Sequence, residues 1–596
     1  MQVPPVLLQD TPLIAPAAND PTTITAARRP ANYQPSIWNH DFVKSLKSDF
    51  AGEVYTKRAE KLKEYVRRMF DDKANNGLSS SSTSLLKLIN TIQRLGVSYH
   101  FDDEIKGALD TITLTIKDND VSIEGDDKDL FTTALRFRLL RQHGYEISQD
   151  VFKSFQEEMR SSSDDFMKPC ICEDVEGMLS LYEASFYAFE GEEILDEAQE
   201  FTGRHLKEYL KNKEGINSTS TPKHLCNHKQ LVSHALDLPL HLRVPRIEAR
   251  WFIDTYEQMM QEDMDPLLLE FAKLDFNMIQ ATYHEELKYV SRWWKELGFT
   301  ETLCYARDRW VENFFWSVGY KFEAKYGHYR IQMTKLNCLI TTIDDIYDVY
   351  GSLDELKLFT DAVDRWDDSM VGALPDYMKI GFLALYNTTN EIACDILKKH
   401  GQDVLGYLRT SWAALCKSYL VEAKWYYSGY KPTLEEFLNN GWISITGSVL
   451  PTHTYVLLGY ETIDDEALEC LKNYSSDLVR WSFMILRLLN DLATSTEELK
   501  RGDVTKSIQC YMHHTGVSES IAREHIKNQI SDMWKKINKD QSASRSIFPR
   551  SFVETILNIN RITHFFYHYG DGHGVPNRET KDWVTSIVIE PIPLLI

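Results

Sequence analysis

The chain has 596 residues, of which 43% are hydrophobic and 12% aromatic, so it can bury a large core and is too long for one ordinary domain. Lys and Arg number 66 against 88 Asp and Glu, and the resulting net charge of −22 excludes general nucleic-acid binding, since the phosphate backbone would be repelled. The nine cysteines show no paired metal-ligand spacing, which favours reduced thiols in an intracellular compartment.

The first segment of the chain, residues 1–27, differs in composition from the rest. It contains five Pro, many small residues and no Lys, Arg or Ser. Such a composition is typical of a disordered leader or a short targeting segment. Plastid transit peptides are normally rich in Arg and Ser and poor in acid, so the composition by itself indicates that address only weakly.

Helical periodicity dominates the rest of the chain. In residues 183–210, apolar residues recur mostly at three- to five-residue steps with carboxylates between them, as in an amphipathic helix pair. Alternating strand patterns bounded by Asn-Gly or Asp-Gly turns are nearly absent, so we predict an all-α protein. The helical pattern also covers residues 267–296, 354–366 and 521–537. Loops are predicted where small and polar residues replace apolar ones, at 79–84, 118–129, 161–165 and 211–223.

An Arg-Asp-Arg triplet at residues 307–309 is followed by a run of aromatic residues. Arg307 and Arg309 lie upstream of an acidic cluster, and basic residues beside metal-binding carboxylates suggest a polyanionic ligand such as a diphosphate. The same triplet is also a common surface salt-bridge pattern. The residues alone leave both interpretations open.

The acidic cluster stands out among seven Asp-Asp pairs, because only Asp344-Asp345 is completed by a third Asp three residues later, Asp348. It follows an apolar run, and the i, i+4 spacing places Asp344 and Asp348 on one face of a helix. Mg²⁺ is typically held by one or two carboxylates together with waters and substrate phosphates. A divalent-metal site is therefore predicted, the alternative being a solvated acidic helix edge.

Residues 441–460 form an uncharged stretch of twenty residues. Their Ser, Thr, His and Pro side chains make the stretch too polar for a lipid bilayer, so no membrane span is predicted. Because the stretch is also too uncharged for a solvated face, it is predicted to be a buried helix with a lining role.

A second set of oxygen donors follows at Asn490, Thr494 and Glu498, which repeat at i, i+4 and i+8 and so form one stripe along a helix. Such a stripe fits a second metal site on the opposite wall of a cavity. Arg487 lies on the same general face and can present its donors to an anion. A polar second half of an ordinary helix is the alternative.

These three motifs together resemble those of a plant class I terpene synthase in their order and spacing. Arg28-Arg29 followed by Trp38 is similar to the tandem-arginine motif of the angiosperm branch that contains monoterpene synthases and some sesquiterpene synthases. The resemblance covers residues 28–596, with family-like stretches at 137–152 (FRLLRQHGYEISQDVF), 179–184 (LSLYEA) and 246–251 (RIEARW).

The resemblance implies a two-domain, all-α architecture: the leader at 1–27, an N-terminal α-barrel domain at 28–255 and a C-terminal catalytic α-bundle of class I at 256–596. The N-terminal part lacks an Asp-x-Asp-Asp motif, which argues against protonation-initiated cyclisation. The implied activity is that of a carbon–oxygen lyase that ionises an acyclic prenyl diphosphate, with no nucleic acid as partner.

The family pattern also implies site residues. Three Mg²⁺ or Mn²⁺ ions are expected. Two of them would be held by Asp344 and Asp348, and the third by Asn490, Thr494 and Glu498. Asp345 is expected to support them from behind. Arg307 and Arg487 are expected to bind the diphosphate, with Arg309 covering the pocket.

Trp316 matches a family position at the base of the pocket, where its ring face would stabilise a carbocation by cation–π attraction. A Trp on an amphipathic helix is as often an ordinary core residue, so both interpretations stay open. Tyr567 and Asp571 belong to a family-like loop that caps the site, and His573 departs from relatives with Tyr there. The uncharged stretch 441–460 would supply the kinked wall of the cavity.

The branch motif favours geranyl diphosphate and a monoterpene product formed in the plastid. The leader composition instead fits farnesyl diphosphate in the cytoplasm. A monomer is expected. An isoprene-forming enzyme is disfavoured because Asn337 and Leu486 stand where such enzymes carry Phe. A chain-elongating prenyltransferase should show two Asp-Asp-x-x-Asp motifs, and a non-catalytic helical scaffold leaves the ligand stripes unexplained.

Overall fold

The computed structural model describes residues 33–75, 80–118, 129–160, 173–213, 223–259, 264–459, 463–501, 505–544, 546–575 and 578–594. Throughout these ranges the secondary structure is helical and no strand occurs, which confirms the predicted all-α class. The tandem arginine pair, Arg28-Arg29, and the leader lie outside the described residues.

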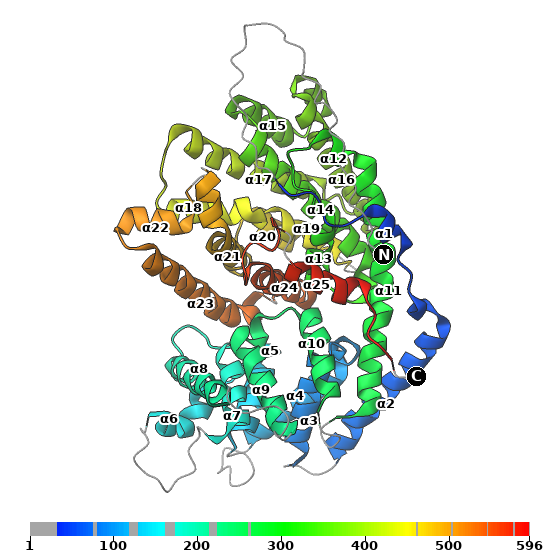
Figure 1. Cartoon of the computed structure of the whole chain (residues 1–596), viewed down its shortest axis with the longest axis vertical. Helices are drawn as coiled ribbons and strands as arrows, with labels where there is room; N and C mark the ends of the chain where they lie inside the picture. Colours follow the sequence, from blue (N-terminus) through cyan, green and yellow to red (C-terminus); the bar gives the residue numbers. More distant parts are fainter. Residues whose placement is uncertain are drawn as a thin grey trace, which may run out of the picture.

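Two groups of helices make up the molecule (Figure 1). The short helix α1 (His40–Ser45) lies against the upper group in that view. The lower group contains the next helices of the chain: α2 (Glu53–Asn75), α3 (Ser80–Arg94), α4 (Asp102–Asp118), α5 (Leu130–Gln142), α6 (Lys153–Arg160), α7 (Val175–Ser185), α8 (Glu193–Lys213), α9 (Lys223–Asp237) and α10 (Pro245–Glu257).

The upper group begins with α11 (Pro266–Leu297), the longest helix, which runs along the side of both groups (Figure 1). The remaining helices are α12 (Phe299–Thr302), α13 (Trp310–Tyr320), α14 (Gly327–Asp345), α15 (Leu353–Arg365), α16 (Asp376–His400), α17 (Leu405–Ser428), α18 (Leu434–Trp442), α19 (Val449–Leu457), α20 (Asp465–Lys472), α21 (Asp477–Arg501), α22 (Ser507–Thr515), α23 (Glu519–Ser544), α24 (Arg550–Tyr567) and α25 (Arg578–Val584). The domain boundary at 255/256 stays a prediction.

Local sequence signals explain where several of these helices begin and end. Helix α11 opens with Pro266 after Asp265, whose side chain accepts a hydrogen bond from the Leu268 amide, and it ends at Gly298 in the left-handed conformation (φ 65°). The predicted helical segments at 183–210, 267–296, 354–366 and 521–537 are confirmed.

One predicted loop is wrong. The Ser-rich segment 79–84 was expected to be a loop, but residues 80–84 form the first turns of α3. Ser is favoured at helix N-termini, where its hydroxyl can satisfy free backbone amides, so a polar run can open a helix as well as interrupt one. The other predicted loops, at 118–129, 161–165 and 211–223, fall almost entirely outside the described residues.

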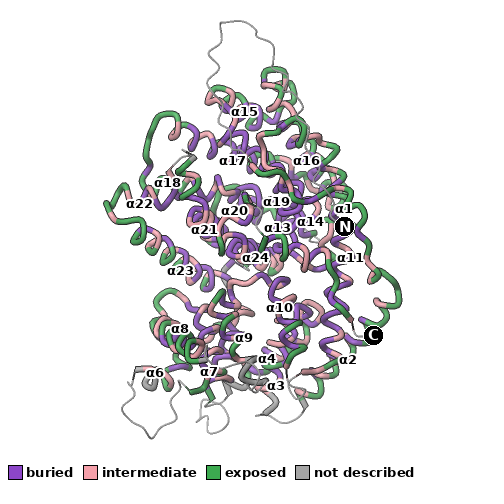
Figure 2. Tube along the Cα trace, in the orientation of Figure 1, coloured by how far each residue is buried: buried purple, intermediate pink, exposed green. Residues whose placement is uncertain are grey.

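Burial is greatest at the centre of the upper group, where α13, α14, α19, α21 and α24 meet (Figure 2). The two groups also contact one another through polar bonds. Asn538 of α23 donates to the backbone oxygens of Phe186 (2.9 Å) and Ala188 (3.1 Å), and Arg561 of α24 donates to that of His241 (2.9 Å).

The last described residues return to α11. The Asn277 side chain donates to the Ile592 backbone oxygen at 2.8 Å and accepts from the Ile592 amide at 2.7 Å. Because Asn277 is fully buried, this reciprocal pair fixes the C-terminal tail against the longest helix.

Buried His453 makes stability depend on pH. Burial lowers its pKa to about 4, against 6.5 when unfolded, and Nδ1 donates to the Val449 backbone oxygen at 2.9 Å. Because the unfolded chain binds the proton more readily between these values, the contribution of His453 to stability is present above pH 6.5 and is lost as the pH falls. When the pH is lowered from 7 to 5, the native protein should lose about 2 kcal/mol of its free energy of unfolding through His453. The His453→Gln variant should not show this loss.

Urea unfolding at the two pH values measures this difference. Exposed His513→Gln is the matched control, since it removes a His from the surface of α22. An equal pH dependence in both variants would contradict the role of burial.

Candidate active site

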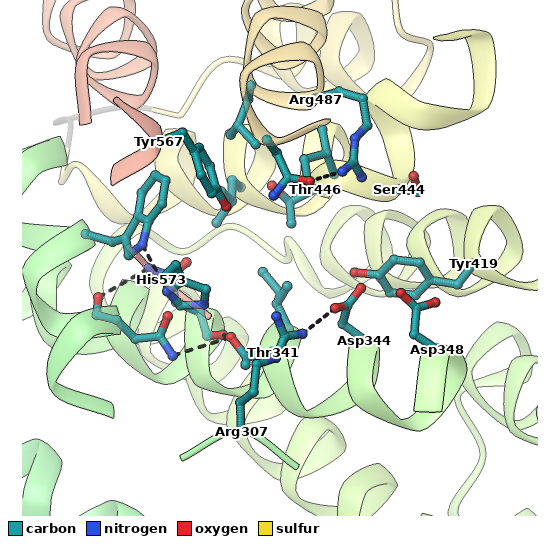
Figure 3. Close-up of a pocket in the computed structure, with 18 of the residues that line it drawn as sticks. Arg307, Thr341, Asp344, Asp348, Tyr419, Ser444, Thr446, Arg487, Tyr567 and His573 are labelled. Carbon is teal, nitrogen blue, oxygen red and sulfur yellow. Dashed lines mark hydrogen bonds and ion pairs between the residues drawn. The ribbon is translucent and has the colours of Figure 1, made fainter. Parts of the chain in front are cut away.

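A cavity of about 140 Å³ lies inside the upper group (Figure 3). Its walls come from α13, α14, α21, the segment around residue 446 and the C-terminal end of α24 with the loop that follows. Seven of the predicted site residues line it: Arg307, Trp316, Asp344, Asp348, Arg487, Asn490 and Glu498. Asp345, Thr494 and Arg309 are not among its lining residues.

The acidic motif occupies the end of α14 and the turn that follows. Helix α14 ends at Asp345, and residues 346–350 continue as a wider π-helical turn that carries Asp348. Asp344 and Asp348 both face the cavity (Figure 3), whereas Asp345 is fully buried. The sequence therefore placed the two cavity-facing carboxylates correctly.

Arg307 holds the buried carboxylate. Its amide donates to Asp345 Oδ2 at 2.7 Å, and its Nε lies 3.0 Å from Asp345 Oδ1. Another guanidinium nitrogen reaches Asp344 Oδ2 at 2.5 Å. Burial raises the pKa of the Asp345 carboxyl, and the charge of Arg307 opposes that shift. Burial by itself would lower the pKa of the Arg307 guanidinium. The charges of Asp345 and Asp344 outweigh this effect, so the pKa of Arg307 lies well above its ordinary value.

The second set of oxygen donors lies on α21, on a different wall from the acidic motif. Asn490 and Glu498 line the cavity, and the hydroxyl of Thr494 donates to the Asn490 backbone oxygen at 2.9 Å. Arg487 donates to the Asn490 side chain and lies 2.8 Å from Asp491, whose side chain is fully buried. The stripe is thus present, with Thr494 turned toward the helix backbone.

Lys506 is a cavity residue that the sequence patterns did not single out. It is buried, its Nζ lies 3.7 Å from Glu498, and it also senses the charge of Asp348. Burial opposes its charge, but Glu498 and other carboxylates raise its pKa, so it stays cationic. A buried lysine between two acidic sets is unusual enough to mark a ligand site. In the sequence, its position just after α21 was the only available signal.

Glu422 lies behind the same cavity and was also missed. Its carboxylate accepts from Ser444 (2.5 Å) and Asn440 (3.0 Å). Burial raises its pKa, while the charges of Lys506 and Arg487 oppose the shift. Its position far from any motif gives the sequence no signal.

Arg309 links two segments that lie beside the cavity. It is almost completely buried, and one guanidinium nitrogen donates to the backbone oxygens of Gln34 and Gly574, both at 3.0 Å. Nearby Trp38 donates its indole N–H to Glu312 at 3.1 Å. The expected covering role of Arg309 thus corresponds to a contact with the N-terminal segment and the 571–575 loop.

Replacing Arg309 by Met is expected to free both segments, because two hydrogen bonds from a charged donor are lost. Each such bond contributes about 1.5–3 kcal/mol. Amide hydrogen exchange should therefore accelerate at least about tenfold in residues 33–46 and 571–575. Exposed Arg365→Met on α15 is the control, and unchanged protection in both segments would show that Arg309 does not hold them.

The apolar end of the cavity contains Trp316. Its ring stacks on Phe566 with centroids 4.4 Å apart and an interplanar angle of 3°. Its indole N–H donates to Nδ1 of His573 at 3.2 Å. Burial lowers the pKa of His573 to about 3, so the ring is neutral and carries its proton on Nε2. Trp316 is therefore held in a fixed orientation at the cavity wall.

The uncharged stretch forms a kinked wall. After α18, residues 443–447 make a π-helical turn in which Thr446 adopts a left-handed conformation (φ 87°), and α19 begins at Val449. Ser444, Ile445, Thr446 and Leu450 line the cavity. A β-branched residue at positive φ is strained, which is common where a site is shaped. The predicted lining role of the stretch agrees with this arrangement.

The donor chemistry fits divalent metals. All cavity-facing candidates are oxygen donors, as hard cations require. No three His, Cys, Asp or Glu side chains converge on one point among the described residues. Each set thus offers only one or two carboxylates, which suits ions shared with a substrate's phosphate oxygens.

Comparison with known proteins agrees with this geometry. Residues 37–236 match the family model "Terpene synthase, N-terminal domain", and residues 295–536 match "Terpene synthase family, metal binding domain". A chloroplastic myrcene synthase of Quercus ilex is 52% identical over 95% of this chain and 90% of its own length.

Two solved structures are similar over nearly the whole chain. Limonene synthase with 2-fluorolinalyl diphosphate has a TM-score of 0.87 and 40% identity, covering 95% of this chain and all of its own. Isoprene synthase from grey poplar leaves, in complex with three Mg²⁺ ions and dimethylallyl-S-thiolodiphosphate, has a TM-score of 0.81 and 42% identity, covering 94% of this chain and 99% of its own.

The chain belongs to the terpene synthase family. It has the two-domain, all-α fold of that family, and it is a lyase that acts on prenyl diphosphates with divalent metal ions. Its similar proteins include plant monoterpene synthases. In the part of the chain that the structure describes, no helix has the length and apolar character to cross a bilayer.

Proposed function

We propose that this terpene synthase ionises geranyl diphosphate and converts the resulting cation to a monoterpene. The observation that carries the proposal is the arrangement of one cavity: two sets of oxygen donors on different walls, three buried or half-buried cations beside them, and an apolar end. The similarity to myrcene and limonene synthases supports the same substrate.

In this proposal, three Mg²⁺ or Mn²⁺ ions are held by Asp344 and Asp348 on one wall and by Asn490, Thr494 and Glu498 on the other. When bound, such ions supply positive charge that stabilises the departing diphosphate. The isoprene synthase structure with three Mg²⁺ supports the number of ions. For Thr494 to be a ligand, its hydroxyl oxygen would give a lone pair to the metal ion while its O–H donates to the Asn490 backbone oxygen.

Arg307, Arg487 and Lys506 are the groups proposed to bind the diphosphate. All three line the cavity and remain cationic despite burial. Because carboxylates already hold their side chains, little reorganisation is needed as negative charge develops. Asp345 positions Arg307, and Arg309 positions the segments that separate the cavity from water.

Trp316 is proposed to stabilise the carbocation. Its ring lines the apolar end of the cavity and is fixed by Phe566 and His573, so one face can lie against the substrate. A cation over a Trp face gains about 2 kcal/mol when desolvated.

We also propose a plastid location and a monomeric enzyme. The chloroplastic address of the Quercus ilex relative supports the first. The location of a fluorescent fusion in leaf cells tests the first statement. Light scattering tests the second, because a monomer should give a mass of 69.2 kDa.

The test of the substrate uses purified protein with Mg²⁺ or Mn²⁺ and either geranyl or farnesyl diphosphate, with volatile products identified by gas chromatography and mass detection. We expect a monoterpene from geranyl diphosphate and at least about tenfold lower kcat/KM for farnesyl diphosphate. Efficient turnover of farnesyl diphosphate would instead make this a sesquiterpene synthase. Absence of turnover with both would contradict the proposed substrates.

A further inference from the structure

A second and larger cavity, of about 570 Å³, lies where the two groups of helices meet. The lower group contributes residues around 185–199 and 241–242, and the upper group contributes faces of α21, α23 and α24. Its volume is in the range of small-molecule sites, roughly 300–1,000 Å³. Tyr567 lines both this cavity and the active-site cavity.

One wall of this inter-domain cavity carries a row of cations. Arg523, Lys527 and Lys535 project from α23 at multiples of four residues, which places them along one side of the helix. No Asp or Glu is among the described residues that line the cavity, although the whole chain has a net charge of −22. The charged residues of the lining are therefore all cations, in a protein that is acidic as a whole.

Two of these cations are held by carboxylates and the third is loosely held. Arg523 lies 2.8 Å from Glu519, and Lys535 lies 2.7 Å from Asp196. Lys527 is 3.9 Å from Glu524 with 64% of its side chain exposed, so it can turn toward an anion at little cost. Lys527 is thus the natural contact for an anionic head group at the rim.

Apolar side chains form much of the cavity wall, and the polar residues among them include His241, His564 and Tyr567. Leu489, Leu492 and Trp534 form much of the wall. His241 is 1% exposed, and Asn538 is a hydrogen-bond neighbour of its ring. Burial lowers the pKa of His241 well below the ordinary value, so the ring is neutral, with one donor and one acceptor. The imidazole therefore adds a neutral polar group to the cavity wall.

We propose that the inter-domain cavity binds an amphiphilic anion, with its apolar chain against Leu489 and Leu492 and its charged head at the α23 row. Both a fatty carboxylate and a prenyl phosphate have this chemistry. The proposal does not depend on which prenyl diphosphate the active site uses. Because Leu492 and Leu489 flank Asn490 on α21, an occupant of the cavity contacts the helix that carries the second ligand set.

Isothermal titration of the full chain with decanoate and with decyl phosphate, in EDTA, tests the proposal. We expect one molecule to bind per chain, with Lys527→Glu weakening binding by about tenfold. Lys536→Glu is the matched control, since it makes the same charge change two and a half turns further along α23, on the opposite side of the helix. Ser531→Trp should abolish binding, because residue 531 lines the cavity and the larger side chain fills it. The stronger of the two probes identifies the head group that the site prefers.

Three results would overturn the proposal. The first is no saturable binding of either probe by the native sequence. The second is an equal loss in Lys527→Glu and Lys536→Glu, which would reveal non-specific attraction. The third is full binding by Ser531→Trp together with displacement by inorganic diphosphate and Mg²⁺, which would place the probe in the active site.

Discussion

Replacing Asp344 by Ala is expected to lower kcat of the enzyme with geranyl diphosphate by about a thousandfold or more, while the fold stays intact. Asp344 faces the cavity and forms an ion pair with Arg307, which also keeps its bonds to Asp345. Losing one group that stabilises charge in the transition state typically costs about 10²–10³ in kcat, and the loss of a metal site adds to this. Steady-state product formation at several Mg²⁺ concentrations measures the effect.

The matched control is Asp361→Ala, which removes an exposed carboxylate paired with Arg365 on α15. Circular dichroism and urea unfolding should show little change in either variant. Metal-dependent turnover by Asp344→Ala within tenfold of the native rate would show that this carboxylate is not a metal ligand.

Replacing Arg487 by Met is expected to lower the free energy of unfolding by about 3–5 kcal/mol, because it leaves a buried charge without its partner. Asp491 is 0% exposed and lies 2.8 Å from the Arg487 guanidinium. The remaining contact of the carboxylate is the Ser507 amide, at 3.0 Å. Urea unfolding followed by tryptophan fluorescence measures the loss.

The double variant Arg487→Met with Asp491→Asn separates the unpaired charge from lost packing. It should recover at least about 1–2 kcal/mol relative to the single variant, since the amide carries no charge. Exposed Arg480→Met, on the same helix, controls for removal of an arginine. No recovery in the double variant would show that the packing of the arginine stem, not its charge, stabilises this part of α21.

Much of the site was predictable because its residues follow helix geometry. The spacing of Asp344 and Asp348, and of Asn490 and Glu498, is enough to place each pair on one face. The spacing cannot tell which way a face turns relative to a cavity. It also does not predict local side-chain bonds, such as the one that Thr494 donates to the Asn490 backbone oxygen. It also cannot reveal the π-helical turn after Asp345, which depends on tertiary packing.

The residues that the sequence did not reveal are those that depend on contacts between distant segments. Lys506 and Glu422 come from separate parts of the chain and meet near Arg487 only after α17, α21 and α22 pack together. Taken singly, a lysine after a helix or a glutamate within one predicts nothing. The Ser-rich run failed for a different reason, because the same residues favour both loops and helix starts.

The reciprocal bond between Asn277 and Ile592 sets a rule for recombining this enzyme with its relatives. A chimera whose crossover precedes α11 inherits the helix and the tail from the same parent. A crossover after residue 297 takes them from different parents and unites surfaces that did not evolve together. Modules of this family are therefore best exchanged at the connection between α10 and α11, with the C-terminal tail travelling with the catalytic bundle.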